Sequence, residues 1–82
     1  MADAATFNVL IATLDRVVFE GKARSLILPG EKGVFEVLPY HKKLLSCLIR
    51  GPLILDGSVF PILKGVVKVG PSDVTVIIEE AR

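Results

Sequence analysis

The sequence predicts an all-β domain, a flattened β-sandwich or barrel of about eight to ten short strands. Apolar residues alternate with polar ones along several segments, which is the pattern of a half-buried strand. Turn signals, mostly Gly, Pro and Asp-Gly, recur about every six to twelve residues. The 82 residues are enough for one domain only.

The expected organisation is a disordered N-terminus at residues 1–6, a folded domain at 7–79 and a polar end at 80–82. Within the domain, we expect strands at residues 7–13, 17–19, 23–28, 34–38, 41–48, 53–55, 59–63, 66–69 and 74–78.

The first three strands follow from alternation and turn residues. Phe7, Val9, Ile11 and Thr13 fall on one face of the first strand, and Asn8, Leu10 and Ala12 fall on the other. The second strand is closed by Gly21. Residues 26–28 form an unbroken apolar run, so we expect this part of the third strand to be buried on both faces.

The middle of the chain is the least regular. Residues 29–33, Pro-Gly-Glu-Lys-Gly, are expected to form a turn in which both glycines are free to adopt positive φ. Residues 34–38 then form a strand that Pro39 ends. Residues 41–48 have leucines at helical spacing, yet their neighbours are strands. We predict a strand there, with a helix as the alternative.

Glycine and proline residues divide the segment from residue 51 onward into shorter strands. The Gly-Pro pair at 51–52 is expected to break the chain, and the Asp-Gly pair at 56–57 is a strong hairpin signal. Pro61 has no N–H to donate to a ladder and therefore predicts an edge position. Gly65 is expected to separate the strand at 59–63 from the next one.

Composition predicts apolar surface outside the core. Hydrophobic residues make up 51% of the chain, whereas a domain of this size buries only about 60–65% of its unfolded surface. Exposed apolar patches usually mark contacts with partners. The net charge of +1 comes without a clustered basic face, so no nucleic-acid partner is expected.

Cys47 is the single cysteine, which excludes an internal disulfide and suits a reducing compartment. Because it lies in an apolar run, we expect it to be buried and inert. We find neither the charged start and apolar core of a signal peptide nor an apolar run near the ~20 residues that span a bilayer. We therefore expect a soluble chain with no direct membrane insertion.

The motifs offer little chemistry. Residues 30–33 share the letters of a nucleic-acid-clamping GXXG loop, but that loop joins two helices, and strands are expected here. His41 is the only histidine and has no second ligand of its kind. Its combination with Ser46 and Asp56 lacks a nucleophile elbow. We predict no catalytic residue, no metal site and no cofactor.

The segment after Pro39 is a candidate contact. His41, Lys42 and Lys43 make a compact cationic turn, and Tyr40 is expected to be exposed beside it. Two interpretations of this cationic turn remain open: it is a solvated loop, or it contacts an acidic or polar surface of a partner.

Read in order, residues 7–79 resemble the N-terminal β-sandwich of the epsilon subunit of the F-type ATP synthase, called delta in mitochondria. The segments that carry the resemblance are FNVLIAT, VVFEG, SLILPGEKGVFEVLPYH, VVKV and VTVII. The central segment is the most specific, since the flanking strands alone would not identify the family.

The resemblance implies a non-catalytic rotor subunit, not an enzyme. It would clamp the gamma subunit, rest on the c ring and couple proton flow to ATP synthesis, as a peripheral subunit on the cytoplasmic face of the cell (inner) membrane. Carried over by position, Ser46 would lie toward gamma. The residues facing the c ring would be Glu31, Lys32, Gly33, Val34, Tyr40, His41, Lys42 and Lys43.

The sequence also departs from the family pattern. Glu36 and Tyr40 stand where the family usually has Gly, and Lys42-Lys43 replaces Ala-Pro. The family continues into a C-terminal helical hairpin that this sequence lacks, either as a natural short form or by truncation, and the hairpin's regulatory roles are not carried over. The alternative is a small β-barrel for protein interaction or single-stranded nucleic acid, which needs aromatic and basic residues on one sheet face.

Overall fold

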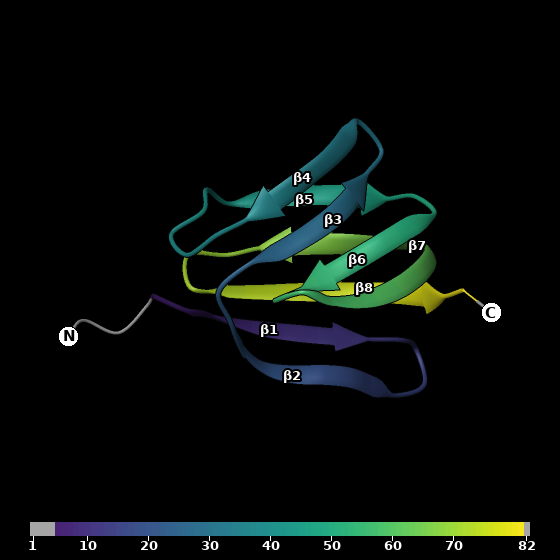
Figure 1. Cartoon of the computed structure of the whole chain (residues 1–82), viewed down its shortest axis with the longest axis horizontal. Helices are drawn as coiled ribbons and strands as arrows, with labels where there is room; N and C mark the ends of the chain where they lie inside the picture. The colour runs from purple at the N-terminus through teal and green to yellow at the C-terminus, as the bar shows by residue number, and fades with distance from the viewer. Residues whose placement is uncertain (1–4, 82) are drawn as a thin grey trace.

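The computed structural model describes residues 5–81, which form eight β-strands and no helix (Figure 1). The strands are β1 (Phe7–Ala12), β2 (Val17–Ala23), β3 (Leu26–Gly30), β4 (Gly33–Val37), β5 (Leu44–Leu48), β6 (Gly51–Leu55), β7 (Ser58–Val69) and β8 (Asp73–Glu80). The all-β prediction is confirmed. Most of the N-terminus expected to be disordered lies outside the described residues. In the part described, no helix has the length and apolarity to cross a membrane.

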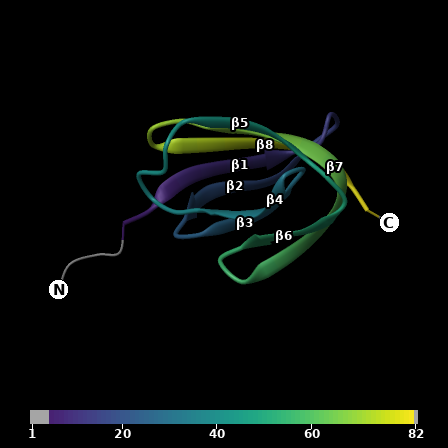
Figure 2. The same ribbon diagram turned by 90° about the horizontal axis from the view of Figure 1, so that it is seen from above.

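The eight strands belong to one sheet that folds over itself. The hydrogen-bonded order is β2-β1-β8-β7-β5-β3-β4, and β6 pairs with both β3 and β7. Figure 2 shows β5 and β8 in one layer and β3 and β6 in the other, with β7 curving between the layers. β1 runs parallel to β8, whereas the other ladders are antiparallel. The result is the predicted flattened sandwich.

β7 is a single strand of twelve residues where the sequence predicted two. Its first half pairs with β6 and its second half with β5, while β8 lines the opposite edge from Ile62 onward. The register with β8 shifts between Ile62 and Lys64. Gly65, read as a breaker, lies within the strand, because a Cβ there would come within 2.5 Å of the Ile77 carbonyl oxygen. The glycine is needed for close approach of two strands.

The prolines also lie inside strands. Gly51 and Pro52 belong to β6, so the predicted break at 51–52 is wrong. Pro52 lies directly opposite Pro61 of β7. The Pro61 carbonyl accepts a hydrogen bond from the Ala81 amide at 3.1 Å, on the side away from β6. Since the N–H and C=O of an antiparallel strand residue point the same way, the missing N–H of Pro61 removes nothing from the β6–β7 ladder. Its N–H side faces β8, whose ladder with β7 starts only at Ile62, so Pro61 fits within an inner strand.

The turn predicted at 29–33 is shorter in the structure. Pro29 and Gly30 extend β3, and only Glu31 and Lys32 form the turn. Gly33 has a φ of 128°, whereas Gly30 is not among the positive-φ glycines. A Cβ on Gly30 would lie 2.8 Å from the Phe35 ring. Gly30 thus serves ring packing, and of the two glycines only Gly33 uses its freedom to adopt positive φ.

The ambiguous segment at 41–48 is a strand in its second half, since β5 begins at Leu44. Residues 41–43 are irregular. Leu48 pairs with Gly30 of β3 and with Gly65 of β7. These two tertiary pairings outweigh the helical spacing of the leucines, because isolated short helices gain little from propensity alone.

The core lies between the layers and is entirely apolar among the residues that the structure describes. The predicted inner face of the first strand is confirmed, since Phe7, Val9 and Ile11 are buried. Ile27 is only half-buried, so the prediction of burial on both faces of β3 is wrong there. The largest fully buried side chains are Ile11, Leu26, Leu28, Leu53, Ile62, Val9, Val37, Val67 and Val76.

The hairpin predicted at 56–57 is confirmed and ties two connections together. Asp56 adopts a φ of 46° in the β6–β7 turn. Its carboxylate accepts hydrogen bonds from the amides of Arg24 and Ser25, at 3.0 and 2.9 Å. Hydrogen bonds to a charged acceptor are stronger than neutral ones. The β6–β7 turn is therefore fastened to the β2–β3 connection.

Replacing Gly65 with Ala tests the close approach of β7 and β8. The new Cβ would overlap the Ile77 carbonyl, so we expect Gly65→Ala to lower the free energy of unfolding by about 2–3 kcal/mol. Urea denaturation measures the change. Lys64→Ala is the matched control, because its side chain is exposed, and it is expected to stay within about 0.5 kcal/mol. Equal stability of the Gly65 variant and the parent would refute the packing argument.

Candidate docking site

A groove of about 620 Å³ opens between β4 and the facing edge of β5. Its lining residues are Gly30, Glu31, Lys32, Gly33, Val34, Phe35, His41, Leu44, Leu45, Ser46, Cys47 and Val66. The groove brings together four of the predicted c-ring residues at 31–34, the predicted c-ring residue His41 and the predicted gamma residue Ser46. Tyr40, Lys42 and Lys43 lie outside it.

The predicted c-ring residues form two groups, separated by the length of β4. Residues 31–33 form the tip of the β3–β4 hairpin, and residues 40–43 follow the far end of β4. Five strand residues span about 17 Å. Figure 1 accordingly shows the β3–β4 turn and the β4–β5 connection at opposite ends of β4. Only His41 reaches from the second group into the groove.

The groove is apolar at its rim and on its floor. Val34 and Leu45 are 73% and 72% exposed on its two sides. Phe35 and Leu44 are half-buried and pack against the core. Large apolar side chains at this exposure favour contact with another surface over contact with water. The exposed apolar surface that composition predicted is therefore concentrated, in part, at this groove.

Cys47 lines the groove and is exposed, so the prediction of a buried cysteine is wrong. The reason is the two-residue period of β5. Leu48 points into the core and Ser46 is half-buried, which turns the residue between them outward. An apolar run in the sequence does not show which of its members face the core.

Ser46 enters the groove from the inner side of β5. It lies opposite Val67, which is fully buried. Its hydroxyl donates a hydrogen bond to the Cys47 carbonyl at 3.2 Å. The side chain is thus partly engaged within its own strand.

The β4–β5 connection carries an unusual backbone. Tyr40 has a φ of 67° and is 87% exposed, although bulky residues rarely adopt the left-handed region. The His41 amide donates to the Leu38 carbonyl at 3.2 Å, and its ring Nδ1 lies 2.8 Å from the Lys42 carbonyl. The exposure predicted for Tyr40 is confirmed.

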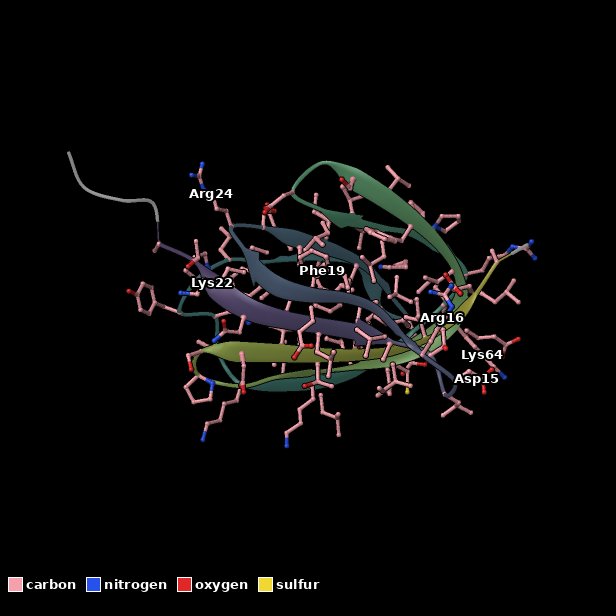
Figure 3. All side chains as sticks on the ribbon, turned by 90° about the horizontal axis from the view of Figure 1, so that it is seen from below. Asp15, Arg16, Phe19, Lys22, Arg24 and Lys64 are labelled. Carbon is pink, nitrogen blue, oxygen red and sulfur yellow. The ribbon has the colours of Figure 1, made fainter. Side chains whose placement is uncertain are left out.

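The lysines of this connection are exposed cations. Within the described part of the chain, ion pairs join Arg16 to Glu80 at 2.5 Å and Lys64 to Glu79 at 3.8 Å, and neither includes Lys42 or Lys43. Figure 3 shows Arg16 and Lys64 together at one end of the sandwich, far from Lys22 and Arg24.

The side chains considered for chemistry are engaged elsewhere. Asp56 binds the amides of the β2–β3 connection, whereas His41 contacts its neighbour's carbonyl. No cluster of three or more potential metal ligands occurs among residues 5–81. Phe7 is buried, and Phe19, Phe35 and Phe60 pack against the core, which disfavours a base-stacking platform.

Sequence reasoning missed six groove residues: Gly30, Phe35, Leu44, Leu45, Cys47 and Val66. Leu45, Cys47 and Val66 share alternation as a signal, since each lies between residues that turn inward. Predicting from alternation that these residues share one groove requires the register of β5 against β7, which pairs Cys47 with Val66. The register depends on tertiary pairing and was not visible in the sequence.

The fold and the groove define a small β-sandwich whose exposed apolar edge is suited to docking against another protein. Residues 6–82 match the family described as "ATP synthase, Delta/Epsilon chain, beta-sandwich domain". The match covers nearly the whole chain, and the chain belongs to this family. The resemblance drawn from the sequence is confirmed.

Individual relatives agree with the family match. The chain is 40% identical over 76 residues to the ATP synthase epsilon chain of Sulfurimonas denitrificans, covering 87% of this chain and 58% of that protein. It is 30% identical over 83 residues to the epsilon chain of Bordetella avium, covering 94% and 58%. The chain thus spans somewhat more than half the length of these relatives.

Solved structures support the fold. A chain of the Euglena gracilis mitochondrial ATP synthase, solved as OSCP/F1/c-ring, superposes with a TM-score of 0.85 at 19% identity, covering 95% of this chain and 53% of that one. A chain of the Tetrahymena thermophila enzyme, solved as central stalk/c-ring, gives 0.79 at 13% identity, covering 96% and 67%.

Tyr40→Gly tests the backbone strain at the β4–β5 connection. The left-handed conformation costs about 1–2 kcal/mol for a non-glycine residue, and the flexibility of Gly in the unfolded chain offsets about 0.4–1 kcal/mol of the gain. We expect the free energy of unfolding to rise by up to about 1 kcal/mol in urea denaturation. Tyr40→Ala, which keeps the penalty, should change little. A loss of stability in the glycine variant would contradict this account.

Proposed function

We propose that this chain is the β-sandwich of a non-catalytic central-stalk subunit of a proton-translocating F-type ATP synthase. It joins the gamma subunit to the c ring and couples proton flow to ATP synthesis, at the cytoplasmic face of the cell (inner) membrane. The observation that carries the proposal is the family match over residues 6–82. The exposed groove beside β4 and β5 supports it, because a rotor subunit requires lasting contacts with its neighbours.

The architecture suits a body that transmits torque. β7 belongs to both layers, and the apolar core between them is continuous. Close-packed protein interiors have low compressibility and transmit strain. A sandwich whose two layers share a strand therefore moves as one unit, and this role needs no active site.

The proposed contact with the c ring uses polar and apolar groups together. The hairpin tip offers Glu31, Lys32 and the exposed Val34, and the β4–β5 connection offers the exposed Lys42 and Lys43. Cations and carboxylates can pair with polar loops of a partner, although exposed pairs contribute little individually. Burial of Val34 adds about 1–2 kcal/mol if the partner covers it fully.

The proposed contact with gamma uses β5. Ser46 is half-buried and lines the inner wall of the groove. Leu45 beside it is far more exposed and presents the larger apolar area. We therefore expect Leu45 to contribute more to this contact than the Ser46 hydroxyl.

Co-assembly tests the proposed function. The chain, mixed with gamma and a detergent-solubilised c ring from one F-type ATP synthase, is expected to co-elute with both in size-exclusion chromatography. Omission of gamma is expected to weaken retention on the ring, because the subunit bridges the two. Failure to associate when both partners are present would count decisively against the proposal.

Charge substitutions locate the contact. Val34→Asp, or Lys42→Glu combined with Lys43→Glu, should weaken association with the c ring at least tenfold, since each places an unfavourable charge on the proposed face. Val59→Asp and Lys22→Glu are matched controls, because both positions are exposed outside the groove. Circular dichroism should show an unchanged fold. Equal effects of test and control variants would place the contact elsewhere.

A further inference from the structure

β4 ends the strand order, so its edge away from β3 has no strand partner among residues 5–81. The two-residue turn after Gly30 makes Gly30 and Gly33 the closing, hydrogen-bonded pair of the hairpin. Hydrogen-bonded and non-hydrogen-bonded pairs alternate along an antiparallel ladder, so the next pair, Pro29 and Val34, is not hydrogen-bonded. Val34 therefore points its N–H and C=O away from β3. The Pro29 carbonyl agrees with this parity, because it accepts from the Ile49 amide at 2.8 Å on the other side of β3.

The edge of β5 that points away from β7 is open at Leu45. The Cys47 carbonyl accepts from the Glu31 amide at 3.2 Å, on the side away from β7. Leu45 lies two residues earlier and therefore points its N–H and C=O in the same direction. β3 pairs with β5 only at Gly30 and Leu48, so β3 does not cover Leu45.

The two open edges run in the same direction. β3 is antiparallel to β4 and also to β5, which makes β4 and β5 parallel to each other. An extended segment entering the groove antiparallel to β5 meets the N–H and C=O of Leu45 on that edge. Exposed edges of this kind are templates for an added strand.

The side chains around the groove fit alternating apolar residues. Leu45 stands at the rim of the β5 wall, and Phe35 and Leu44 form the partly buried floor. An added strand turns every second side chain toward the floor. The segment should therefore be apolar at alternate positions.

Charge at one end of the groove fixes the polarity of the segment. Lys42 and Lys43 precede β5, and Lys68 lies directly opposite Leu45. Asp73 is the one acidic residue in the adjoining hollow that Lys43 and Lys68 line. A strand antiparallel to β5 ends where β5 begins. Its C-terminal end therefore meets these cations and is complemented by carboxylates.

We propose that the groove between β4 and β5 accepts an extended segment of a partner protein as an added strand, antiparallel to β5. The segment is apolar at alternate positions and acidic at its C-terminal end. The inference rests on the proposed function only in taking the partner to be a neighbouring subunit. Pairing with β5 extends one layer of the sandwich and covers both Leu45 and the groove floor.

Peptide binding to the whole chain tests the inference without other subunits. The probe is an eight-residue peptide of alternating Val and Thr that ends in Glu-Glu, compared with one that ends in Lys-Lys. Nuclear magnetic resonance titration of the labelled protein should show saturable binding of the acidic peptide, with shifts of the Leu45 and Cys47 amides. The lysine-ended peptide should bind at least tenfold more weakly.

Two changes isolate the backbone pairing. Leu45→Pro removes the N–H that faces the groove and should weaken binding at least tenfold, whereas Leu45→Val keeps the N–H and should stay within threefold. Peptides N-methylated at odd or at even positions leave the protein untouched. The peptide whose methyl groups lie on its edge facing β5 should bind at least tenfold more weakly. The peptide methylated on its other edge should keep most of its affinity.

Several outcomes would overturn the inference. These are no saturable binding at about 1 mM, equal binding of the acidic and basic peptides, or equal loss with both N-methylation patterns. Concentration-dependent dimerisation with shifts at Leu45 and Val34 would identify a second copy as the occupant and also overturn it. Because the readout uses the chain alone, failure here leaves co-assembly with gamma and the c ring as a separate result.

Discussion

The structure depends on one strand that belongs to two layers. β7 pairs with β6 through its first half and with β5 through its second, while β8 runs along its other edge. The change of layer coincides with the register shift between Ile62 and Lys64 and with the close approach of Gly65 to β8. Because backbone hydrogen bonds cross this bend continuously, the layers cannot slide past each other without breaking a ladder.

The open groove is a consequence of this arrangement. β7 closes the sandwich on one side, but the opposite side is joined only where the end of β3 meets the end of β5. Beyond that junction β4 stays paired with β3, whereas β5 stays paired with β7. The edges of β4 and β5 therefore diverge from each other. Val34 and Leu45 stand exposed on the diverging edges. The exposed apolar surface at Val34 and Leu45 therefore results from the incomplete closure of the sheet between β4 and β5.

The sequence was most informative where local chemistry decides the structure. Alternation located the strands, and the Asp-Gly hairpin at 56–57 formed as expected, because its turn type follows from two residues. It was least informative where Gly or Pro serves a tertiary contact. Gly65 admits a neighbouring carbonyl and Gly30 admits a ring, whereas the sequence predicted a break between strands at Gly65 and a turn at Gly30. The candidate site was also predicted only in part. His41 and Ser46 were predicted as contact residues and both line the groove, whereas the outward direction of Cys47 depends on the β5–β7 register.

The separation of the two predicted contact groups bears on how such a domain works. If the hairpin tip and the Tyr40 connection served one small partner site, the length of β4 between them would be a disadvantage. A large partner surface, such as the proposed c ring, makes the separation useful, because each end of β4 can contact a different part of that surface while the groove lies between. Tyr40 fits this view: it holds a costly backbone conformation while packing against little of its own domain. Strain of this kind persists where the surrounding structure enforces it, and it concentrates at functional sites. A bridging subunit needs such contact points at a fixed distance from each other, and a sandwich whose layers share β7 holds that distance constant.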